Sequence, residues 1–80
     1  MKITILLFGI LKDIVGENSI ELPIEKDTSI INLKAGLLED YKNLNKYSNF
    51  SVAVNEAYVE ANYILKSDDV VALIPPVSGG

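Results

Sequence analysis

Ile30 to Tyr41 reads IINLKAGLLEDY and has the clearest helical hydrophobic period in this chain of 80 residues. Apolar side chains recur three and four positions apart, which places them in one stripe along a helix: Ile30, Leu33, Leu37, Leu38 and Tyr41. Thr28 or Ser29 can cap its first turn. Gly36 costs up to about 1 kcal/mol in a helix, which a close helix-sheet contact or simple tolerance can explain. Because an apolar stripe must be covered, we expect this helix to pack against a sheet.

The segments on either side of this helix predict that sheet. Their alternating apolar residues and turn signals indicate strands at 2–8, 19–24, 51–54, 57–59 and 70–74, with a short helix at 10–15. Pro23 makes 19–24 an edge strand, because proline donates no hydrogen bond to a sheet. The polar segment 42–49 is expected to be a surface loop.

This order of elements favours an α+β fold with a single main helix. If the first and last strands lie side by side at the centre of a mixed sheet, with the helix across one face, the result is a β-grasp, or ubiquitin-like, roll. A ferredoxin-like fold would need a second long helix. We expect a β-grasp domain at 1–75 and a flexible, extended Gly-Gly tail at 76–80.

Composition excludes several functions. The chain has no cysteine and no histidine, which removes disulfides, thiolate catalysis and the usual histidine chemistry, and we predict no metal site. A net charge of −4 argues against nucleic-acid binding. The apolar start reaches Lys12 too soon to span a bilayer and no cleavage site follows it, so we expect a cytoplasmic protein without membrane contact.

The chain ends with a stiff segment followed by a slender one, Pro75-Pro76-Val77-Ser78-Gly79-Gly80. Two successive prolines favour an extended backbone, and Gly79 and Gly80 carry no side chain. The α-carboxylate of Gly80 could therefore pass down a narrow channel into the active site of another protein. The alternative is a chain end without function.

Three stretches resemble the small, sulfur-carrying subunit of molybdopterin synthase, the MoaD family, and the resemblance covers the whole chain. They are Phe8-Gly9 after the first strand, VAVNE at 52–56 and VVALIPPVSGG at 70–80. Two positions depart from the family pattern. Asp68 stands where a glycine is usual before the last strand, which would strain that turn, and Lys12 stands where an arginine is usual.

The resemblance implies a function as a sulfur carrier. A partner of the ubiquitin-activating type would use ATP to convert the Gly80 carboxylate into an acyl-adenylate, and sulfur would then replace AMP to give a thiocarboxylate. The large synthase subunit, in a heterotetramer of two small and two large subunits, would receive the tail and pass the sulfur to cyclic pyranopterin monophosphate. The chain would bind no cofactor and would be no enzyme on its own.

The resemblance and the strand pattern also indicate where partners bind. Phe8, Tyr58 and Ile74 are expected on the sheet face opposite the helix, near the root of the tail, as an apolar docking surface. Two other functions stay open. The chain could be a thiamine-pathway sulfur carrier or a ubiquitin-like protein modifier, although thiamine carriers usually lack the Phe-Gly-helix opening. It could also be a non-catalytic interaction module with an idle tail.

Overall fold

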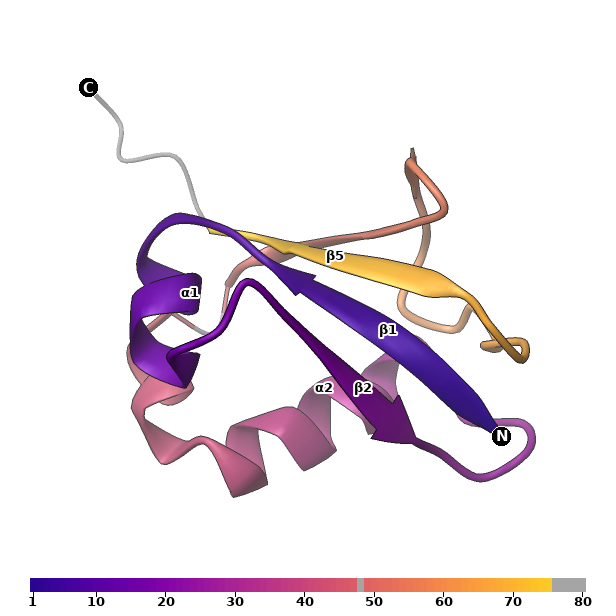
Figure 1. Ribbon diagram of the computed structural model, residues 1–80. Helices are drawn as coiled ribbons and strands as arrows, with labels where there is room; N and C mark the ends of the chain where they lie inside the picture. The colour runs from indigo at the N-terminus through magenta and orange to yellow at the C-terminus, as the bar shows by residue number, and fades with distance from the viewer. Residues whose placement is uncertain (48, 76–80) are drawn as a thin grey trace.

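A computed structural model describes residues 1–47 and 49–75, and within them five strands form one mixed sheet (Figure 1). In chain order the elements are β1 (Lys2–Leu7), α1 (Gly9–Val15), β2 (Ser19–Pro23), α2 (Ile30–Asp40), the 3-10 helix η1 (Lys42–Tyr47), β3 (Ser51–Val54), β4 (Ala57–Tyr58) and β5 (Val70–Ile74). No helix in the described part of the chain has the length and apolar character needed to cross a membrane.

The first and last strands lie together at the centre of the sheet. The strand order is β2-β1-β5-β3-β4, with β1 and β5 parallel and the other neighbouring pairs antiparallel. The β1–β5 register aligns Thr4 with Val70 and Leu7 with Leu73. The long helix α2 crosses one face of this sheet (Figure 1). The predicted β-grasp roll is therefore confirmed.

The core lies between the sheet and α2. From the sheet come Ile3, Ile5, Leu7, Val71 and Leu73, each at most 3% exposed, and from the helix come Ile30, Leu33 and Leu37. Burying a side chain of this size contributes about 1.5–3 kcal/mol to folding. Ser29 caps α2 as predicted, because its Oγ accepts a hydrogen bond from the Asn32 amide at 3.2 Å. A Cβ added at Gly36 would meet nothing within 4 Å, so no close packing requires that glycine.

The expectation of a surface loop at 42–49 is wrong. Residues 42–47 form η1, and Leu44 within it is fully buried. Its amide donates a hydrogen bond to the Tyr41 carbonyl at 2.9 Å, which continues the chain directly from α2. A single leucine among lysines and asparagines has no periodicity, so the pattern gave no sign that it closes one end of the core. Of the predicted strand 57–59, only Ala57–Tyr58 pairs.

Candidate functional site

The root of the tail packs against the start of α1. Pro75, directly after β5, is half-buried, and a Cβ added at Gly9 would lie 3.2 Å from its Cγ. Gly9 also has a φ of +55°, a backbone conformation that residues other than glycine rarely adopt. Both the backbone conformation and the close approach of the proline therefore favour glycine here. The remaining tail positions, Pro76, Val77, Ser78, Gly79 and Gly80, lie outside the described residues.

The sheet face opposite α2 carries apolar side chains that no element of the described chain covers. Leu6, Phe8, Val70 and Ala72 line a hollow of about 460 Å³ together with Asn55 and Glu56. Phe8 is 47% exposed and Val70 is 37% exposed. Exposed apolar clusters of this kind commonly mark interaction sites. The hollow opens on the same side of β1 and β5 that the strand alternation predicted for a docking surface.

The three predicted docking residues have different environments. Phe8 lines the hollow, whereas Tyr58, on β4, is 73% exposed and lies further along the same sheet face. Cross-strand pairing aligns Tyr58 with Ala53, Ala53 with Ala72 and Ala72 with Leu6. Ile74 is half-buried and pairs with Ser51 of β3. Their role in binding a partner stays a prediction.

A two-residue turn at the edge of the hollow has an uncommon backbone. Asn55 and Glu56 join β3 to β4 and have φ values of +51° and +71°. Positive φ at both central residues is the pattern of a type I′ turn, in which Asn-Gly is the preferred pair. Asparagine fits the first position, but glutamate is a strained choice for the second. The turn itself was predicted from Asn55-Glu56, while the strain was not.

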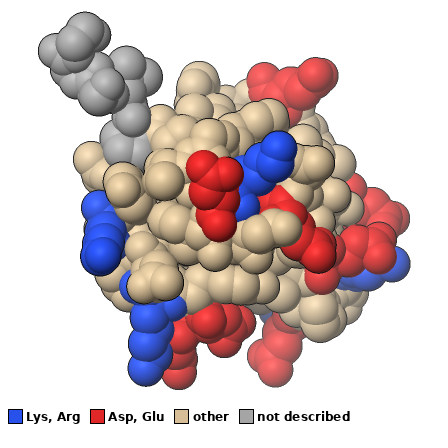
Figure 2. All heavy atoms as spheres, turned by 60° about the vertical axis from the view of Figure 1, so that its left-hand side comes forward, with Lys and Arg blue, Asp and Glu red and all other residues tan. Residues whose placement is uncertain are grey.

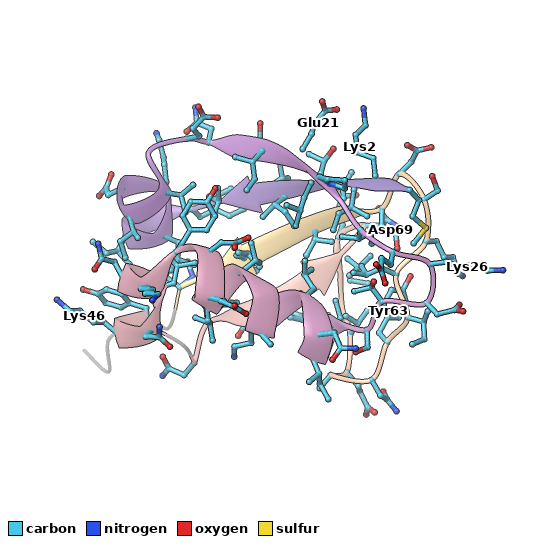
Figure 3. The ribbon with its side chains drawn as sticks, turned by 90° about the horizontal axis from the view of Figure 1, so that it is seen from below. Lys2, Glu21, Lys26, Lys46, Tyr63 and Asp69 are labelled. Carbon is cyan, nitrogen blue, oxygen red and sulfur yellow. The ribbon has the colours of Figure 1, made fainter. Side chains whose placement is uncertain are left out.

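One buried carboxylate holds this turn to the start of β5. Asp69 is 6% exposed, and its Oδ1 accepts a hydrogen bond from Asn55 Nδ2 at 3.0 Å. Its Oδ2 accepts from the Lys66 amide at 2.8 Å and from the Tyr63 hydroxyl at 3.4 Å. Figure 3 shows Tyr63 beside Asp69. A carboxylate with three donors satisfies its hydrogen-bonding capacity well enough to be buried.

Asn55 completes the connection in the other direction. Its side-chain Oδ1 accepts a hydrogen bond from the Val70 backbone N–H at 3.0 Å, and the backbone N–H of Asn55 donates to the Val70 carbonyl at 2.8 Å. We call Asp69 with Asn55 the Asp-Asn clamp. Sequence reasoning placed Asp69 only in a turn, because 14 positions separate it from Asn55. An aspartate directly before an apolar strand was the one signal available.

The turn before β5 contains the expected strain. Asp68, which stands where the resembled family usually has glycine, has a φ of +68°. Its amide donates to the Lys2 carbonyl at 2.9 Å, so the residue is held beside the start of β1. Aspartate tolerates this region better than most residues, which explains how the departure is accommodated.

Among the residues that the structure describes, the face that includes α1 carries no large cluster of charges of one sign that would indicate a binding site. In Figure 2, lysines and acidic residues are interspersed on an otherwise uncharged surface. An ion pair joins Lys2 to Glu21 at 3.3 Å, and Figure 3 labels both side chains. Because both side chains are more than half exposed, this pair contributes little to stability. Across residues 1–47 and 49–75, no three acidic side chains gather in a way that could hold a metal ion.

Comparison with known proteins gives one family and several relatives. The profile of the ThiS family matches residues 5–80. The molybdopterin synthase sulfur carrier subunit of Dictyostelium discoideum is 40% identical over 81 aligned positions, which cover 95% of this chain and 93% of that protein.

Two solved structures have the same fold. A protein-protein complex of subunits 1 and 2 of the molybdopterin-converting factor from Helicobacter pylori contains a chain with a TM-score of 0.72 and 27% identity, with full coverage of both chains. The small archaeal modifier protein 1 of Haloferax volcanii matches with a TM-score of 0.83 over 95% of this chain and 98% of its own. At 19% identity, that likeness shows the fold alone.

Proposed function

This chain belongs to the ThiS family, and we propose that it is the sulfur carrier subunit of a molybdopterin synthase. The observation that carries this proposal is the 40% identity to the Dictyostelium discoideum sulfur carrier subunit over nearly the full length of both proteins. The likeness to a chain of the Helicobacter pylori two-subunit complex supports the same assignment.

The proposed chemistry takes place at the Gly80 carboxylate. A carboxylate oxygen attacks the α-phosphate of ATP in an activating partner of the ubiquitin-activating type, and pyrophosphate leaves. Sulfur at the oxidation level of sulfide (HS⁻) then attacks the acyl carbon and AMP leaves, which gives a thiocarboxylate without any oxidation or reduction. In the large subunit the thiocarboxylate gives its sulfur to cyclic pyranopterin monophosphate, and a carboxylate is restored with an oxygen from water. This is covalent catalysis with the nucleophile on a chain end.

The folded body would serve this chemistry by fixing where the tail begins. Pro75 follows a central strand that pairs with β1 on one side and β3 on the other, and it packs against Gly9. A carrier of this kind needs no cofactor of its own, because the activating partner uses the ATP. Without its partners it would be the sulfur-donating part of an enzyme complex and not an enzyme.

The proposed partner surface is the sheet face opposite α2. The large subunit would contact Phe8, Tyr58 and Ile74, close to the tail root, in a heterotetramer of two small and two large subunits. Phe8 and Tyr58 offer exposed aromatic side chains, and aromatic residues often provide most of the binding energy of an interface.

Mass spectrometry and one deletion test the proposal. Protein from cells with an intact pathway should contain a C-terminal peptide heavier by about 16 Da, the change from carboxylate oxygen to sulfur. Deleting Gly80 moves the reactive carbon back by about 3.3–3.6 Å. Since misplacing a reacting atom by 1 Å can cost about a hundredfold in rate, we expect sulfur transfer to be abolished.

Two controls accompany this experiment. The thermal midpoint of the shortened chain should equal that of the full chain, which separates loss of function from loss of fold. Ser78→Ala should transfer sulfur normally and Ser78→Trp should not, because a narrow channel excludes bulk. Normal sulfur transfer without Gly80, or no heavier peptide, would contradict the proposal.

A further inference from the structure

Glu56 is the exception among the residues with strained backbone. In the described part of the chain four residues other than glycine have positive φ: Asp27, Asn55, Glu56 and Asp68. Asparagine and aspartate reach this region at low cost because their short side chains bond locally to the backbone. Glutamate has no such advantage, and a residue in this conformation costs about 1–3 kcal/mol. Glycine would remove that cost, so the Glu56 side chain needs a reason to be there.

The residues on either side of Glu56 prevent its backbone from relaxing to a less strained conformation. The Asp-Asn clamp uses both the nitrogen and the oxygen of the Asn55 amide, and the residue on its other side, Ala57, pairs with Val54. The turn is therefore anchored before and after Glu56. Because these hydrogen bonds occupy the polar atoms of the Asn55 side chain, that side chain does not offer them to a ligand. Of the two polar residues that line the hollow, Glu56 is the one available to bind.

The hollow has the chemistry of a site for a long cationic side chain. Its floor is apolar, formed by Leu6, Phe8, Val70 and Ala72, and no lysine or arginine lines it. Glu56 is exposed and forms no ion pair with any residue in 1–47 or 49–75. Lysine and arginine combine an aliphatic stem that packs on apolar surface with a charged end that pairs with a carboxylate. The floor and the carboxylate together match both parts.

We infer that Glu56 is a specificity-determining residue, which selects a partner that places a lysine or arginine of its own in this hollow. The inference deepens the proposed function and rests on it, with the large synthase subunit as the partner. The apolar floor would contact the stem of the partner's side chain, and the Glu56 carboxylate would accept hydrogen bonds from its charged end. The strained turn would keep the carboxylate in position before binding.

The test measures the affinity of the full chain for the large molybdopterin synthase subunit encoded in the same genome, by titration calorimetry. Glu56→Gln removes the charge, and Glu56→Gly removes the whole side chain together with the strain. Asp27→Gly is the matched control, because it also removes one negative charge and places glycine at a position with positive φ. Asp27 lies between β2 and α2 and is not among the residues that line the hollow.

We expect both Glu56 variants to bind about tenfold more weakly at low salt. The difference should shrink at about 0.5 M salt, where exposed charges are screened. Glu56→Gly should raise the thermal midpoint, whereas Asp27→Gly should change it little, because aspartate reaches positive φ at low cost. Asp27→Gly should also bind like the wild type. A gain in stability together with a loss of affinity at position 56 alone would identify a residue retained for binding.

Three results would overturn the inference, and they are distinguishable. If the wild type binds the large subunit and both Glu56 variants bind within about twofold of it, Glu56 does not select the partner, although the proposed function stands. If the wild type itself fails to bind the large subunit, the proposed function fails and the inference fails with it. Equal weakening by Asp27→Gly would show that net charge, and not the hollow, governs affinity.

Discussion

The two faces of the central β1–β5 pair have similar side chains and different environments. On the face toward α2, Ile5 and Val71 are completely buried, whereas on the opposite face Phe8 and Val70 are 47% and 37% exposed. Alternation places successive residues of the same two strands on opposite faces. An apolar face left uncovered by its own chain is costly in water. The inner face therefore provides folding stability, and the outer face is available to a partner.

Of the two phenylalanines in the chain, one is buried in the core on the inner side of the sheet and the other is exposed on the outer side. Phe50 is 4% exposed, packs in the core and has the Lys34 ammonium 4.7 Å from the centre of its ring. Phe8 is half-exposed at the edge of the hollow. The same substitution at both positions therefore compares the faces directly.

Phe50→Ala should have the largest effect on the fold. Removing a buried phenyl ring leaves a cavity and typically costs about 3–5 kcal/mol, and the contact of the ring with Lys34 is lost as well. The free energy of unfolding, measured by urea denaturation, should fall by that amount. A loss below about 1 kcal/mol would show that Phe50 does not belong to the core, and the comparison of faces would fail.

Phe8→Ala should lower the affinity for the partner and leave the stability of the fold nearly unchanged. We expect its affinity for the large synthase subunit to fall by about 2 kcal/mol, roughly thirtyfold. Its free energy of unfolding should stay within about 1 kcal/mol of the wild type. Calorimetry on the two proteins together and urea denaturation of the variant alone separate these quantities. An unchanged affinity combined with a large loss of stability would make Phe8 a core residue.

Gly9→Ala should have a smaller effect, at the point where the chain leaves the outer face for α1. Its positive φ costs an alanine about 1–2 kcal/mol, and the new Cβ would press on Pro75 at 3.2 Å. The thermal midpoint should therefore fall. Gly36→Ala is the matched control, because open space surrounds that position and alanine there should stabilise α2 by up to about 1 kcal/mol. Equal midpoints for the two variants would mean that Gly9 and Pro75 are not packed as described.

Much of the fold could be predicted because it depends on local patterns. The apolar stripe of Ile30 to Tyr41 and the alternation in 2–8 and 70–74 indicated the main helix, the central strands and their two faces. The pairing of β1 with β5 was expected from the order of the elements. The same alternation placed Phe8 and Ile74 on the outer face, whereas Tyr58 was added from the β-grasp arrangement, and the family resemblance indicated the same docking surface.

The amino-acid sequence alone was enough to predict the main helix, the central strands with their two faces, and the family to which the chain belongs. Three features are visible only in the folded structure: Leu44 is buried, Gly9 contacts Pro75, and Asp69 accepts a hydrogen bond from Asn55 beside the strained Glu56. The physical reason is the range of the interactions. Periodicity reports how a residue relates to neighbours three or four positions away, whereas each of these contacts joins segments that meet only after the chain has folded.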